Sequence, residues 1–74
     1  MSMEMDEYVN SVKGINIMTR RKMQRAFDSD NAATELYALI NKTPENHIFP
    51  HVRQHLQEFW SQNFNIESVK PEDR

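Results

Sequence analysis

Apolar residues recur at spacings of three and four along most of the chain, which is the period of an α-helix that buries one face. The first such segment covers residues 3–13. Its apolar stripe consists of Met5, Tyr8, Val9 and Val12. Carboxylates fill its first turns, where the positive end of the helix dipole favours negative charge. Gly14 follows directly and is expected to serve as the C-cap of this helix.

The middle of the chain predicts two more helices. Residues 20–27 form one, with Thr19 as the expected N-cap and with Met23, Ala26 and Phe27 on one face. A polar turn at residues 28–31 separates it from the next helix, at residues 31–41. That helix has the clearest apolar stripe of the chain and is expected to be central to the core. The stripe consists of Ala33, Leu36, Tyr37 and Ile40.

The C-terminal helix can be placed in two ways. Thr43-Pro44-Glu45 is a typical helix start, but a helix beginning there would have Pro50 at its seventh position, where proline breaks a hydrogen bond. Either residues 44–48 form a separate turn and the main helix starts near Phe49, or one helix is kinked. We prefer the first interpretation. The apolar face would then consist of Phe49, Val52, Leu56, Phe59, Trp60 and Phe64.

These elements predict an all-α protein, a small three- to four-helix bundle. One glycine and three prolines in 74 residues fit a helix-rich chain, and no strict alternation typical of strands extends beyond a few positions. A single helical domain is expected over residues 1–64. Residues 65–74 are polar, contain Pro71 and are expected to form a frayed, flexible tail. The sequence shows no internal repeat.

The composition limits how such a bundle is stabilised. A domain of about 60 residues buries only roughly 60% of its surface, so it is marginal alone. The chain has no cysteine for disulfides, and 38% of its residues are hydrophobic, below the roughly 45–50% of typical globular chains. A partner chain or a second copy would therefore add stability. No apolar run is long enough to span a membrane, and the acidic N-terminus lacks a signal-peptide pattern, so a cytoplasmic location is expected.

A cluster of four cations lies in a chain whose formal net charge is −2. The cluster consists of Arg20, Arg21, Lys22 and Arg25. Three interpretations are open: a solvated helix face balanced by Asp28 and Asp30 or by the acidic first helix, a surface for an acidic protein, or a phosphate-binding surface for nucleic acid. A nucleic-acid-binding domain usually has an excess of positive charge, whereas this chain has an isoelectric point near 5.8.

The other notable residues are aromatic side chains and histidines. Phe59, Trp60 and Phe64 span a wide arc of one helix, so they form either core or an exposed interface patch. His47, His51 and His55 are spaced four apart, which suits metal chelation on a continuous helix. Pro50 interrupts that spacing and no cysteine is present, so these histidines are only weak candidates for a metal site.

The sequence favours a non-enzymatic protein that acts by binding. No catalytic motif is present, and a bundle this small rarely encloses a substrate pocket, so no enzyme activity, cofactor or small-molecule substrate is expected. We expect a regulatory or adaptor protein whose partner is another protein, including a second copy of itself. The expected contact residues are Arg20, Arg21, Lys22, Arg25, Phe59 and Trp60. The alternative is a dimeric nucleic-acid-binding transcriptional regulator that places the basic helix on phosphates.

Overall fold

Four α-helices and one short 3₁₀ turn form the part of the chain that the computed structural model describes, residues 4–69. The helices are α1 (Met5–Ser11), α2 (Ile17–Phe27), α3 (Ala32–Lys42) and α4 (Pro50–Asn63), and the 3₁₀ turn η1 is Ile66–Ser68. No β-strand occurs within residues 4–69. The predicted all-α fold is therefore confirmed.

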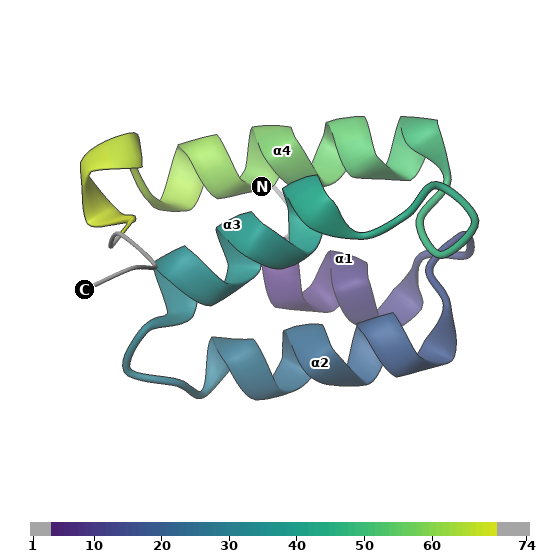
Figure 1. Ribbon diagram of the computed structural model, residues 1–74, viewed down its shortest axis with the longest axis horizontal. Helices are drawn as coiled ribbons and strands as arrows, with labels where there is room; N and C mark the ends of the chain where they lie inside the picture. Colours follow the sequence, from purple (N-terminus) through teal and green to yellow (C-terminus); the bar gives the residue numbers. More distant parts are fainter. Residues whose placement is uncertain (1–3, 70–74) are drawn as a thin grey trace.

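The helices form a ring in which each packs against the next and α4 packs against α1 (Figure 1). Successive helices run in opposite directions, so the two loops at residues 12–16 and 43–49 meet at one end of the bundle. Among residues 4–69, the buried core between the helices is apolar apart from Thr19. Its buried apolar residues are Met5, Val9, Ile15, Met23, Ala26, Leu36, Ile40, Ile48, Val52, Leu56 and Trp60.

Helix α2 begins three residues earlier than its apolar pattern predicts. Its N-cap is Asn16, whose side-chain oxygen accepts hydrogen bonds from the backbone N–H groups of Met18 (2.8 Å) and Thr19 (3.4 Å). Thr19 is therefore not the cap but a buried residue in the first turn. The prediction failed because asparagine and threonine are both good caps, and the sequence places them only three residues apart.

Pro50 is the first residue of α4, and Phe49 is its N-cap. Proline is well suited to this position because its missing N–H would have no partner inside the helix and its φ is already helical. Residues 44–48 form a separate turn, in which the N–H groups of His47 and Ile48 donate to the carbonyl of Pro44. The interpretation of a helix interrupted before Pro50 is thus confirmed.

Gly14 lies beyond the end of α1, whose C-cap is Val12. Its φ of +113° is in the region that favours glycine. Its carbonyl accepts a hydrogen bond from the N–H of Phe49 (3.0 Å), which brings the two loops together. A Cβ at this position would lie 3.0 Å from Cγ2 of Val52 and 3.3 Å from Cδ2 of Phe49. Gly14 therefore permits close contact between the loops instead of capping the helix.

The segment after α4, where the predicted tail begins, forms the 3₁₀ turn η1. The side chain of Asn65 accepts a hydrogen bond from the N–H of Ser68 (3.1 Å) and caps η1. Val69 packs against the core. Residues 70–74, the rest of the predicted tail, lie outside the described residues.

Two arginines close the ends of α1 and α3. The Arg20 guanidinium donates to the carbonyls of Val9 and Val12, and the Arg53 guanidinium donates to those of Ile40 and Thr43. In each case the acceptors are the C-cap residue and the residue three positions before it. Helix C-termini leave carbonyls without intrahelical partners, and a cation there also suits the dipole. Each arginine thus fastens its own helix to the end of the preceding one.

The matching arginines belong to a structural repeat that the sequence does not display. Arg20 and Arg53 are both the fourth residue of their helices. Ile15 and Ile48 pair in an antiparallel β-bridge, flanked by the hydrogen bonds Asn16 N–H to His47 O and Phe49 N–H to Gly14 O. Arg20 and Arg53 are 33 residues apart, and so are Ile15 and Ile48. The hairpins α1–α2 and α3–α4 are therefore related by an approximate two-fold axis through the bridge.

We predict that Arg20→Gln lowers the free energy of unfolding by about 2 kcal/mol, because the carbonyls of Val9 and Val12 lose a charged donor. Arg21→Gln is the matched control, since Arg21 is exposed and contacts no such carbonyl. Chemical denaturation followed by circular dichroism measures both. Equal losses for the two variants would contradict the assigned role of Arg20.

We also predict that Gly14→Ala destabilises the fold by about 1–3 kcal/mol, because alanine is strained at this φ and its Cβ would press on Val52. Lys13→Ala, at the neighbouring exposed position, is expected to melt like the wild type. Thermal denaturation compares the two variants. An unchanged melting temperature for Gly14→Ala would show that the loops do not need this close contact.

Candidate functional site

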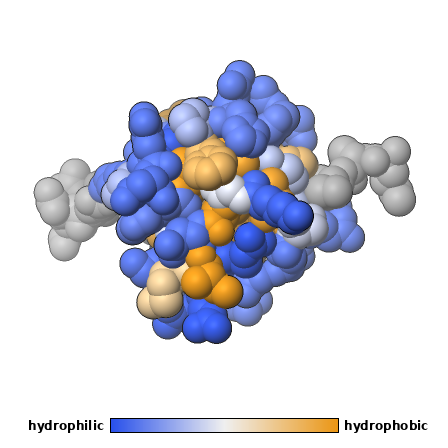
Figure 2. Space-filling model, turned by 90° about the vertical axis from the view of Figure 1, so that its right-hand side faces the viewer, coloured by the Kyte–Doolittle hydropathy of each residue, from blue (hydrophilic) through white to orange (hydrophobic). Residues whose placement is uncertain are grey.

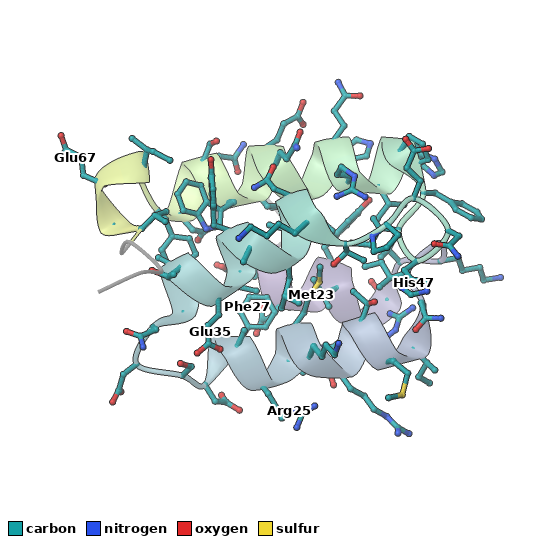
Figure 3. All side chains as sticks on the ribbon, viewed as in Figure 1. Met23, Arg25, Phe27, Glu35, His47 and Glu67 are labelled. Carbon is teal, nitrogen blue, oxygen red and sulfur yellow. The ribbon has the colours of Figure 1, made fainter. Side chains whose placement is uncertain are left out.

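The four cations predicted to act together have two different roles in the structure. Arg20 is partly buried and donates to backbone carbonyls of α1, so it contributes to the fold. Arg21, Lys22 and Arg25 are exposed. The Arg25 side chain extends from α2 into solvent (Figure 3) and also lines a hollow beside α3. Three cations of the original cluster are therefore available at the surface.

None of these three cations is neutralised by a carboxylate of the described chain. Within residues 4–69, Arg21, Lys22 and Arg25 take part in no ion pair. Asp28 lies on the same side of α2 as Arg21 and Arg25 but does not pair with them. The interpretation in which nearby acidic residues balance the cluster thus has no ion pair to support it in this region.

The predicted aromatic contact residues lie mainly inside the bundle. Trp60 is only 6% exposed, and its indole N–H donates to the carbonyl of Ala33 (3.0 Å). The Trp60 ring lies 5.0 Å from that of Tyr37 and 5.6 Å from that of Phe64. These contacts occupy the indole on both its polar and apolar sides. Trp60 therefore joins α4 to α3, and only a small part of its surface reaches solvent.

Phe59 is partly buried and packs between α4 and α1. Its ring lies 5.0 Å from that of Tyr8, which in turn lies 6.0 Å from the His55 ring. Burial raises the pKa of the Tyr8 hydroxyl above its ordinary value, so this group stays neutral at physiological pH. The Tyr8–Phe59 contact fills the surface between these two helices with aromatic rings.

Within residues 4–69, three of the four exposed large hydrophobic side chains lie where the two loops meet, and the fourth, Ile66, lies in η1. Ile17, Met18 and Phe49 are 60%, 58% and 53% exposed, and we call them the apolar end patch. Figure 2 shows hydrophobic surface crossing this end of the molecule between polar side chains. The sequence placed Phe49 in a buried stripe and left Ile17 and Met18 in a connection. Correct helix boundaries, from the Asn16 cap and Pro50, would have identified all three.

The end patch continues into a mixed apolar and basic surface on α2. Met18, Arg21, Lys22 and Arg25 follow the spacing i, i+3, i+4 and i+7, so they share one side of the helix, which we call the outer face of α2. All four are exposed. The groups on this face can give a partner apolar contact and hydrogen bonds from guanidinium and ammonium groups.

The two-fold repeat provides an internal comparison for this face. The counterparts of its four residues on α4, each 33 positions later, are His51, Gln54, His55 and Glu58. These are also exposed, but they are polar and include one carboxylate. The same fold is therefore built with and without the apolar and basic character. The composition of the outer face of α2 is not a requirement of the bundle.

The three histidines do not form a common site. His47 lies in the turn before α4 and is partly buried, whereas His51 and His55 are exposed on α4. Nδ1 of His55 lies 3.9 Å from a carboxylate oxygen of Glu58. Within residues 4–69, no three histidine, aspartate or glutamate side chains are close enough together to hold a metal ion.

A hollow of about 330 Å³ lies between α3, α4 and η1, with Tyr37, Trp60, Phe64 and Ile66 among its lining residues. It is near the lower end of the size range of small-molecule pockets, roughly 300–1,000 Å³. Its polar lining consists of amide side chains, the Ser61 hydroxyl and the Tyr37 phenol. The hollow thus offers a mainly apolar surface whose lining residues include no carboxylate, histidine, lysine or arginine.

None of the helices in residues 4–69 is both long enough and apolar enough to cross a bilayer. Comparison with known proteins gives no match to any family model, to any curated protein or to any solved structure.

Proposed function

We propose that this chain is a small, non-enzymatic adaptor or regulatory protein of the cytoplasm that acts by binding another protein. The docking surface consists of the outer face of α2 and the adjoining apolar end patch. The observation that carries this proposal is the exposure of apolar residues beside three cations of α2 that form no ion pair in residues 4–69. The corresponding face of α4 has neither the apolar residue nor the cluster of arginine and lysine.

The two kinds of residue have complementary physical roles. Ile17, Met18 and Phe49 leave apolar area in water that a partner would bury, and each buried side chain of this kind contributes about 1.5–3 kcal/mol. Cations at the rim of an interface chiefly increase the association rate and select an acidic partner. This surface replaces Phe59 and Trp60 of the sequence hypothesis, because the bundle itself uses those two rings.

The partner is a different protein rather than a second copy that uses the same face. A two-fold dimer places the same surface patch of both copies together, so the cations Arg21, Lys22 and Arg25 of one copy would lie near those of the other. Like charges held together in this way oppose association. An acidic surface on another protein has no such cost.

Nucleic acid is the second candidate, and the unpaired state of Arg21, Lys22 and Arg25 also favours it, since such cations bind phosphates. The apolar end patch favours protein, because phosphate contacts make no use of exposed Ile17 or Met18. Capture of partners from a lysate of the native host, with the chain tagged after Arg74 and with or without nuclease, separates the two. A protein retained after nuclease treatment supports the first candidate, and recovery that depends on nucleic acid supports the second.

We predict that Met18→Glu and Arg21→Glu each weaken the captured complex about tenfold, which corresponds to about 1.4 kcal/mol. Met18→Glu would place a charge in the apolar contact, and Arg21→Glu would repel an acidic partner. Titration calorimetry with the purified partner measures the affinity. Arg21→Glu should act mainly on the association rate and should reduce its salt dependence.

The matched controls are His51→Glu and Gln54→Glu, the same changes at the two-fold counterparts on α4. Both should bind like the wild type, and all four variants should keep its melting temperature. Wild-type affinity for Met18→Glu and Arg21→Glu, or equal losses for the α4 controls, would exclude the outer face of α2 as the docking surface.

A further inference from the structure

A shallow trough runs along the surface between α2 and α3. Two adjoining hollows of about 460 Å³ and 380 Å³ form it, and they share Lys22, Ala38 and Leu39. The trough extends from Glu35 to Lys42 along α3, about 10 Å at the helical rise, and continues to the turn at His47. Its open side and its length suit a segment of polypeptide better than an enclosed small molecule.

The floor and the rims of the trough differ in character. Ala38 and Leu39 on α3 provide an apolar floor that is only partly buried. Lys22 and Arg25 line the α2 side without an ion pair in the described residues. The carboxylate of Glu35, at one end, accepts a hydrogen bond from the Ser29 hydroxyl (3.0 Å) and so faces the α2–α3 turn.

The two-fold repeat shows that this trough is not forced by the fold. The equivalent surface lies between α4 and α1. The two carbonyls of α1 that accept from Arg20 precede the two carbonyls of α3 that accept from Arg53 by 31 residues. By this offset Leu39 corresponds to Tyr8 and Ala38 to Glu7. On that side the rings of Tyr8 and Phe59 pack against each other in a tilted arrangement and fill the surface. Between α2 and α3 the equivalent positions carry small or aliphatic residues, and the surface remains hollow.

We propose that the trough binds an acidic amphipathic helix of the partner protein, an inference that rests on the proposed protein-binding function. Apolar side chains of that helix, three and four residues apart, would contact Ala38 and Leu39. Carboxylates on its flank would pair with Lys22 and Arg25. A helix laid in an apolar groove is a recurring mode of peptide recognition, and the unpaired cations give this groove its preference for negative charge.

The test is an NMR titration of the ¹⁵N-labelled full chain with a synthetic helical peptide of about 14 residues. The probe has leucines at i, i+3, i+4 and i+7, glutamates on the flanking positions and alanines elsewhere. The control peptide has lysine in place of every glutamate. The expected result is a set of shift changes at Lys22, Ala38 and Leu39 with the acidic peptide and none with the basic one.

Two variants locate the site. Lys22→Glu and Ala38→Glu should each weaken binding of the acidic peptide about tenfold. The fold accommodates glutamate in place of Ala38, because Glu7 occupies the counterpart of this position on α1. His55→Glu, the counterpart of Lys22 on α4, should bind the peptide like the wild type. Wild-type spectra outside the trough confirm that each variant is folded.

Several outcomes would contradict the proposal that the trough binds an acidic helix. Shift changes confined to Ile17, Met18 and Phe49 would place the peptide on the apolar end patch, so the trough would be excluded while the proposed docking function stands. Equal binding of the basic peptide, or no binding of either peptide, would exclude an acidic helix. Shift changes at Ala38 and Leu39 that grow with protein concentration, without peptide, would assign the trough to a second copy.

Discussion

The bundle depends on the antiparallel contact between its two loops. Ile15 and Ile48 pair at the approximate two-fold axis, with one backbone hydrogen bond on either side. The helices are 7 to 14 residues long, and isolated helices shorter than about 12–15 residues are marginal in water. Their stability must therefore come from packing against one another. The loop contact holds the two hairpins in register, and Arg20 and Arg53 hold each hairpin closed beside it.

The periodicity of apolar residues predicted the buried residues well, but it did not predict the hydrogen-bond partners of polar side chains. The stripe in α3 buries Leu36 and Ile40, and Pro50 marks the start of α4, both as predicted. The role of Arg20 could not be predicted in this way, because an arginine that reaches a carbonyl of the preceding helix has the same local sequence as a solvated one. The carbonyl partner of Trp60 lies 27 residues away and is equally invisible to local patterns.

The structural repeat was hidden for a related reason. Counterparts inside the bundle are apolar but seldom identical: buried Met23 corresponds to buried Leu56, and partly buried Phe27 to buried Trp60. Packing tolerates such exchanges of apolar side chains when volume is kept nearly constant. The identical pairs include the two isoleucines of the bridge and the two capping arginines. They also include Gln24 and Gln57, whose side-chain amides donate to Asn10 and Asn41, a pair of counterparts on α1 and α3. Once these pairs are aligned, the repeat separates the residues that the fold requires in both hairpins from those that occur in one hairpin alone. The residues of the outer face of α2 belong to the second group.

The burial of Trp60 also determines which structural changes its fluorescence can report. It is the single tryptophan of the sequence, held in a mostly apolar setting against the Ala33 carbonyl and the rings of Tyr37 and Phe64. Helix α4, which carries it, lies diagonally across the ring of helices from α2 (Figure 1). Its fluorescence is thus a built-in optical signal for the integrity of the α3–α4 hairpin. An event at the surface of α2 would change this emission only by altering the packing of the whole bundle.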